Sequence, residues 1–169
     1  YGLKINGDLR GDKHTIYEGG TNVPFLVSWP GMVKEGSVSD DMVNLMDIFA
    51  TVCEITDGTL PESKDVAPDS YSFLPSLLNK TNPHPRASMV TSDANGMRAM
   101  LSGNWKYIDD TPPEGLPDAR LNRLEGFEPQ LYDLSKDPGE TTNLYLENPS
   151  MAKKLSEELD RIIKANFTR

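Results

Sequence analysis

The sequence predicts a mixed α+β fold, and three features lead to this prediction. The first half of the chain contains an apolar run followed by two helical patterns, the second half contains consecutive strand-like segments, and an amphipathic helix ends the chain. Strand-like segments without helices between them favour an antiparallel sheet over a parallel one. The chain of 169 residues is long enough for a core of its own, since about 150 residues bury roughly 70% of their unfolded surface.

The first expected elements are a loop and a strand. Residues 1–20 mix glycines with charged side chains and show no period, which predicts an irregular loop. The run 23–29 (VPFLVSW) is apolar and rich in β-branched and aromatic residues, and Pro30-Gly31 follows it. We therefore expect a buried strand over 23–29 that ends in a turn.

Two helices are expected next. From residue 39 to Cys53, apolar residues recur at steps of three and four, and Ser37 and Asp40 have the spacing of a capping box. This pattern predicts an amphipathic helix that packs on an apolar surface. A second, short helix is expected over residues 70–78.

The second half of the chain predicts a small antiparallel sheet. Segments 87–92, 96–109 and 130–134 have strand composition, and turn residues separate them, including a turn at 102–104 inside the middle segment. Residues 111–129 combine prolines with many charges, which predicts a long excursion between strands.

The last element is predicted to be a helix that lies on this sheet. Asn148 can cap its start, and Pro149 suits the first helical position. Its apolar stripe consists of Met151, Leu155, Leu159, Ile162 and Ile163.

Composition excludes several classes of function. Lysine and arginine number 17 against 26 aspartates and glutamates, and the resulting charge of -9 argues against a nucleic-acid partner. The single cysteine excludes an internal disulfide and a thiolate zinc cluster. No apolar run approaches the ~18 residues of a membrane span. The chain begins at Tyr1 rather than Met, so we expect a piece of a longer protein whose targeting segment lies elsewhere.

Two neighbouring residues are candidate functional groups. Lys13 is a cation on a glycine-flanked loop ahead of the apolar run, which suits an oxyanion such as sulfate, phosphate or carboxylate. A solvated loop lysine is the plainer interpretation. His14 could donate a proton, although a lone histidine more often packs or faces solvent.

Two further groups of residues have both a functional and a structural interpretation. Asp133, Asp137 and Glu140 could form a calcium loop, but they lack the spacing of an EF-hand, and Asp-Pro-Gly is a turn in its own right. Trp105 and Tyr107 could stack on a sugar, and core packing under the terminal helix is the interpretation we favour.

Four blocks of the sequence, in the same order, resemble the sulfatase family. The first is LRGDKHTIYEGGTNVPFLVSWPG (residues 9–31), which is similar to the family segment Gly-x-Lys-x-x-x-x-Glu-Gly-Gly followed by a Val-Pro strand and Trp-Pro-Gly. The others are residues 39–51, residues 103–108 (GNWKYI) and residues 131–144 (LYDLSKDPGETTNL). The chain thus resembles the C-terminal part of a sulfatase.

The resemblance implies a chemistry of which this chain carries a small part. Sulfatases hydrolyse sulfate esters with a formylglycine made in a Cys/Ser-x-Pro-x-Arg motif, and a calcium ion polarises the sulfate. That motif is absent here, and Cys53 lies on the apolar stripe of a predicted helix, where a core position is expected. Lys13 alone matches a family active-site position, that of a lysine which contacts the substrate sulfate. Calcium and formylglycine are therefore expected in the full-length enzyme, with no metal or cofactor bound by this chain.

The resemblance also implies how the chain is organised. Residues 1–80 are expected to end the sulfatase-type α/β catalytic domain, and residues 81–169 to form a small subdomain of antiparallel sheet and terminal helix that shapes the substrate mouth. The chain alone is expected to be inactive. Its expected partners are a sulfated small molecule or glycan and the N-terminal catalytic domain of the same protein, and the exposed face could cause self-association. A periplasmic, secreted or lysosomal location is typical of the family.

Two other functions remain open at this point. A relative in the same superfamily could cleave phosphate or phosphonate esters, because a lysine does not distinguish sulfur from phosphorus. The second open function is that of a module that binds a glycan or a partner without catalysis. Clustering of Lys13, Arg10, Lys106 and Arg98 on one face would favour anion binding, and scatter would favour structural roles.

Overall fold

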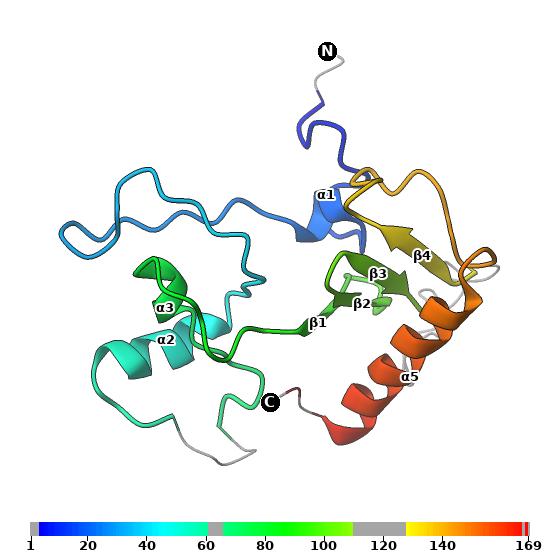
Figure 1. The fold of residues 1–169 in the computed structure, drawn as a ribbon. Helices are drawn as coiled ribbons and strands as arrows, with labels where there is room; N and C mark the ends of the chain where they lie inside the picture. The colour runs from blue at the N-terminus through cyan, green and yellow to red at the C-terminus, as the bar shows by residue number, and fades with distance from the viewer. Residues whose placement is uncertain (1–3, 61–65, 110–127, 167, 169) are drawn as a thin grey trace. The chain divides into compact units, whose positions relative to one another are not determined.

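A computed structural model describes residues 4–60, 66–109, 128–166 and 168 (Figure 1). The chain forms two compact units. The first, the sheet unit, consists of Tyr1–Pro24 and Ser88–Arg161, and the second, the helix-pair unit, consists of Phe25–Ala87 and Ile162–Arg169. The mixture of helices and antiparallel strands confirms the predicted α+β class.

The sheet unit contains four antiparallel strands, in the spatial order β1-β2-β3-β4. The strands are β1 (Ser88–Ser92), β2 (Arg98–Ser102), β3 (Trp105–Ile108) and β4 (Gln130–Asp133). Between β2 and β3 the chain turns at Gly103, whose φ of 55° is a conformation that glycine adopts without a steric penalty. The predicted antiparallel sheet and its turn at residues 102–104 are therefore confirmed.

The helix α5 (Pro149–Ala165) packs on this sheet, as Figure 1 shows. The Asn148 carbonyl accepts hydrogen bonds from the first free N–H groups of the helix, so Asn148 and Pro149 begin it as predicted. The Ser88 hydroxyl of β1 donates a hydrogen bond of 2.9 Å to Glu158 of α5. The buried cluster of the unit consists of Ile16, Met97, Ala99, Ile108 and Tyr132.

The N-terminal residues of the sheet unit form turns rather than a featureless loop. One helical turn, α1 (Glu18–Thr21), follows them, and Ile16, just before it, is 2% exposed in the core cluster. The apolar side chain of Ile16 therefore anchors this segment to the sheet.

In the helix-pair unit, helix α2 (Asp47–Ile55) begins later than predicted. The capping pair is not Ser37 with Asp40 but Asn44 with Asp47. The Asn44 carbonyl oxygen of the side chain accepts a hydrogen bond from the Met46 N–H, and the Asp47 carboxylate accepts one from the Asn44 N–H at 2.8 Å. This reciprocal bonding lies in the turn just before the helix, where it satisfies the N–H groups of Asn44 and Met46.

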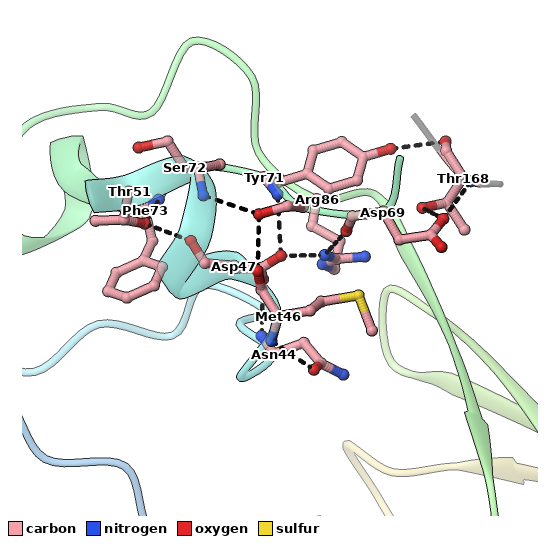
Figure 2. Close-up of polar contacts among 12 residues, drawn as sticks. Asn44, Met46, Asp47, Thr51, Asp69, Tyr71, Ser72, Phe73, Arg86 and Thr168 are labelled. Atoms are coloured by element: carbon pink, nitrogen blue, oxygen red, sulfur yellow. Dashed lines mark hydrogen bonds and ion pairs between the residues drawn. The ribbon is translucent and has the colours of Figure 1, made fainter. Parts of the chain in front are cut away.

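A buried ion pair ties α2 to the segment that follows it (Figure 2). The Asp47 carboxylate receives the Arg86 guanidinium and a hydrogen bond of 3.0 Å from the Tyr71 N–H. Arg86 also donates to the Asp69 carbonyl at 2.7 Å, and its guanidinium lies 4.5 Å from the centre of the Tyr71 ring. The short helix α3 (Leu74–Leu77) follows within the range predicted for it.

The predicted strand over 23–29 is wrong for this structure. Residues 23–29 form no strand, and among the described residues none pairs with them. Leu26 is 87% exposed, and Phe25 makes an edge-on contact with the Phe73 ring at 5.6 Å between centroids. The physical reason is that a strand needs a neighbouring strand for its backbone hydrogen bonds, and apolar composition alone does not supply one.

Most of the excursion expected over 111–129 lies outside the described residues. Within the described residues, no helix combines the length and the apolar character needed to cross a membrane.

Candidate functional site

The candidate site is the loop of residues 10–17, called the Lys13 loop below. Lys13 and His14 are adjacent and exposed at its turn. His14 has a φ of 80°, in the left-handed region that a side chain rarely adopts, so the chain reverses sharply there. Within the described part of the chain, neither side chain takes part in a hydrogen bond or an ion pair. Both are therefore available to a ligand.

Short hydrogen bonds close the Lys13 loop on itself. The Asp12 carbonyl accepts bonds from the Thr15 N–H at 3.0 Å and from the Thr15 hydroxyl at 2.7 Å. Across the base of the loop, the Gly19 N–H donates to the Arg10 carbonyl at 2.7 Å. The Asn6 amide donates to the Gly19 carbonyl from the other side at 3.1 Å. The turn that carries Lys13 is consequently held at its base as well as at its tip.

The two glycines after Glu18 are required by space rather than by φ. A side-chain carbon at Gly19 would lie 2.4 Å from the Gly11 carbonyl oxygen, and one at Gly20 would lie 2.3 Å from the Thr15 carbonyl oxygen. Both neighbours are backbone atoms of the Lys13 loop, which cannot rotate away. Glycine therefore lets the loop pack directly against α1.

A buried ion cluster attaches α1 to the rest of the sheet unit. The Lys106 ammonium lies 2.8 Å from the Glu18 carboxylate and 2.9 Å from the Glu140 carboxylate. Glu140 also accepts a hydrogen bond of 2.6 Å from the Glu18 N–H. The side chains of Lys106 and Glu140 are fully buried, and that of Glu18 is 8% exposed. Lys106 belongs to β3, so the cluster joins the Lys13 loop to the sheet.

Arg10 makes a second attachment at the base of the loop. Its guanidinium donates hydrogen bonds of 3.0 Å to the Tyr132 hydroxyl and to the Glu140 carbonyl. It also lies 3.8 Å from the centre of the Tyr17 ring. Such a cation over an aromatic face adds to the attraction of the two hydrogen bonds.

Burial and the neighbouring positive charge act in opposite directions on the Glu140 carboxyl group of this cluster. Burial raises the pKa of the Glu140 carboxyl above its ordinary value, while the Glu18 N–H and the Lys106 charge oppose that rise. Lys106, Glu18 and Glu140 together carry one net negative charge when all are ionised, and the Arg10 guanidinium beside them balances it. The arrangement is therefore compensated, although it lies in a low dielectric.

The structure gives Asp133, Asp137 and Glu140, which were considered as a calcium loop, three different sets of partners. Asp133 bonds to Ser135 and Lys136, Asp137 accepts bonds from the residues after its own turn, and Glu140 points to Lys106. Among the described residues, no group of three or more His, Cys, Asp or Glu side chains could hold a metal ion.

The other candidate residues have structural surroundings. Tyr107 is 3% exposed, which confirms its predicted core position, and Trp105 is half-buried. Cys53 is half-buried on α2 rather than fully buried as expected. The reason is that much of the apolar face of α2 is uncovered in the helix-pair unit, where Phe49 and Val52 are about half exposed.

The four cations do not form an anion-binding patch. Lys106 is buried in its ion cluster, Arg10 binds Tyr132 and Glu140, and Arg98 lies 3.7 Å from the Asp109 carboxylate. Sequence reasoning left Lys106 open between an anion-binding patch and a structural role, and it missed the partner Glu140, 34 positions further along the chain. The one available signal was the place of Lys106 between Trp105 and Tyr107 on a predicted strand.

Comparison with known proteins gives consistent matches. A family model described as Sulfatase matches residues 2–59, which include the Lys13 loop. The N-acetylgalactosamine-6-O-sulfatase of Bacteroides thetaiotaomicron is 36% identical over 92% of this chain and 30% of its own length. Human arylsulfatase A is 32% identical over 82% of this chain and 29% of its own length. The chain thus spans about 30% of the length of the curated relatives it matches.

Solved structures agree with these matches. One, from a study of the metabolism of multiple glycosaminoglycans by Bacteroides thetaiotaomicron, is 36% identical, with a TM-score of 0.76 over 92% of this chain and 32% of that chain. The crystal structure of Ps i-CgsB is 20% identical and has a TM-score of 0.66 over 90% of this chain. At that identity the second match shows the fold alone.

Proposed function

The chain belongs to the sulfatase family, and from this premise we propose that it is the C-terminal part of an enzyme that hydrolyses sulfate esters. One observation carries the proposal. The segment that matches the Sulfatase family model contains Lys13, and that lysine is exposed and unpaired within the described residues, on a loop attached to a buried core.

In this proposal Lys13 contacts the sulfate group of the substrate. An ammonium held on a rigid loop stabilises negative charge that grows on the sulfate oxygens, and it needs little rearrangement during the reaction. His14 is placed beside it, where it could give a proton to the leaving oxygen. Both roles require groups from outside this chain, because a lysine that binds the sulfate and a histidine that donates a proton leave the attack on sulfur to another group.

Formylglycine does not fit the sequence of this chain, and calcium does not fit its described residues. Cys53 lies on α2 and is followed by Glu54-Ile55-Thr56 instead of a Pro and an Arg at the family spacing. The acidic side chains of the described residues form no metal-binding group. We assign both groups to the part of the protein outside this chain and derive no step through them.

Exposed apolar side chains support an origin in a larger protein. Many of them gather in the helix-pair unit: Phe25, Leu26, Val27, Met32, Val38, Leu45, Met46, Ile48, Phe49, Val52, Ile55 and Val66. Exposed apolar surface of this extent marks a packing interface. We propose that residues 1–80 complete the catalytic domain, whose remaining part covers this surface, while residues 81–169 form a subdomain at the substrate mouth. The same surface makes self-association of the isolated chain expected.

The proposed substrate class is a sulfated sugar. The similar Bacteroides thetaiotaomicron protein is named for sulfate at the 6-position of N-acetylgalactosamine. A non-catalytic module that binds polyanions is disfavoured, because three of its four candidate cations have partners inside the fold. A phosphate or phosphonate ester hydrolase remains the alternative, since the Lys13 ammonium accepts either oxyanion.

Substitution of Lys13 tests this function. In the full-length protein, Lys13→Ala is expected to lower kcat/KM for 6-sulfated N-acetylgalactosamine by about 100-fold, the order found when one charge-stabilising group is removed. Lys153→Ala is the matched control, because Lys153 is 76% exposed on α5. Release of sulfate and of phosphate from matched esters is measured in parallel. Absence of sulfate release by the unsubstituted enzyme, or release of phosphate instead, would contradict the proposal.

A further inference from the structure

The third and fourth sequence blocks, residues 103–108 and 131–144, meet at the base of the Lys13 loop. Lys106 comes from β3, Glu140 follows the turn after β4, and both bind Glu18 at the start of α1. Glu18 is five residues from Lys13 in the chain, whereas Lys106 and Glu140 are 88 and 122 residues from Glu18. The position of the loop therefore depends on residues far away in sequence.

We propose that Glu140 and Lys106 are positioning residues for Lys13, and that the small sheet of this chain sets where the sulfate-contacting ammonium stands. The proposal rests on the function proposed above. It deepens that function by giving the sheet a part in catalysis beyond forming the substrate mouth.

The geometry favours positioning over a purely stabilising role. The Glu140 carboxylate contacts Glu18 in two ways. It accepts a hydrogen bond from the Glu18 N–H, and it pairs with the Lys106 ammonium, which also pairs with the Glu18 carboxylate. These contacts hold Glu18, the first residue of α1, at both its backbone and its side chain. Gly19 of α1 bonds to the Arg10 carbonyl, and that bond carries the constraint into the Lys13 loop.

Arg10 fixes the other end of the same loop. It binds the carbonyl of Glu140, the residue whose side chain holds Glu18. Glu140 thus touches both ends of the segment that presents Lys13. A displacement of about 1 Å in a charge-stabilising group lowers a rate by about 100-fold, so this double attachment has a measurable consequence.

A double-mutant cycle on kcat/KM in the full-length enzyme is the first test. In the protein that retains Lys13, we expect Glu140→Gln to lower kcat/KM by about 10- to 100-fold. In the Lys13→Ala background it is expected to lower kcat/KM by less than about twofold, because the group it positions is already absent. Equal losses in both backgrounds would overturn the proposal, since they would mean that Glu140 acts on folding or on another group.

Hydrogen exchange of the loop amides is the second test, and it does not depend on turnover. We expect Glu140→Ala to speed exchange at the Glu18 and Gly19 amides by about tenfold or more, with Glu140→Gln intermediate because its amide oxygen can still accept from Glu18. Glu157→Gln is the matched control, since Glu157 is 70% exposed and pairs with Lys153 at 3.8 Å. Unchanged exchange in Glu140→Ala would overturn the positioning role.

A variant outside the buried cluster guards against a failure to fold. Arg10→Met changes a residue that is exposed overall, yet it removes the hydrogen bonds to Tyr132 and Glu140. Arg10→Met is expected to speed hydrogen exchange at the Gly19 amide. Its loss of kcat/KM is expected to be large when Lys13 is present and small in the Lys13→Ala background. If the full-length protein releases no sulfate, the proposed function fails, while the exchange measurement still decides whether Glu140 holds the loop.

Discussion

Removal of Arg86 tests the buried ion pair of the helix-pair unit (Figure 2). The side chains of Arg86 and Asp47 are each 2% exposed, so Arg86→Met leaves a carboxylate in a low dielectric without its counter-charge. Hydrogen bonds from the N–H groups of Tyr71 and Asn44 remain, and they cannot neutralise that charge. Loss of one partner of a buried pair costs about 3–5 kcal/mol, and we expect the free energy of unfolding to fall by this amount.

Urea unfolding measures this loss. The chain has two tryptophans, Trp29 in the helix-pair unit and Trp105 in the sheet unit. In a Trp105→Phe background, tryptophan fluorescence therefore reports on the unfolding of the helix-pair unit alone. With a slope of about 1–3 kcal/mol per molar urea, the midpoint should move by more than about 1 M.

The control for this experiment is Lys34→Met, which removes an exposed lysine charge from the same helix-pair unit. Exposed charges contribute little, so its midpoint is expected to stay at the wild-type value. The double variant Asp47→Asn with Arg86→Met removes both charges and should recover part of the loss. A midpoint for Arg86→Met equal to that of the control would refute this reasoning.

Further predictions concern the sheet unit. Gly19→Ala should lower the free energy of unfolding by about 1–3 kcal/mol in urea titrations, because its side-chain carbon would lie 2.4 Å from a backbone oxygen; an unchanged midpoint would show that the loop can shift. Because burial raises the pKa of Glu140 above 4.5, the folded state keeps this proton to higher pH than the unfolded state does. The corresponding stability is present below pH 4.5 and is lost as the pH rises through the folded pKa. Glu140→Gln should remove that decline from urea midpoints measured as a function of pH, and an identical pH profile in the variant would contradict the assignment.

Local patterns predicted the elements whose partners are close in sequence. The strands β1 to β3 follow one another through short turns, and α5 carries its capping residues with it, so turn and cap chemistry were sufficient. The start of α2 was missed because two capping pairs were possible. The choice of Asn44 over Ser37 accompanies the burial of Asp47 against Arg86, a partner 39 residues away.

The apolar run 23–29 shows a second limit. Its composition is that of a strand, yet composition does not supply the neighbour that strand hydrogen bonds require, and the described residues offer none. Apolar content indicated that these residues pack against something. It did not indicate where that surface lies.

The sequence was enough to predict the α+β class, the antiparallel strands and the loop that carries Lys13, because each depends on patterns within a short stretch or on family blocks. The tertiary structure alone decided the role of Lys106 and Glu140. Lys106 and Glu140 lie far apart in the sequence, and they form an ion cluster only when the fold brings β3, β4 and α1 together and removes water from between them.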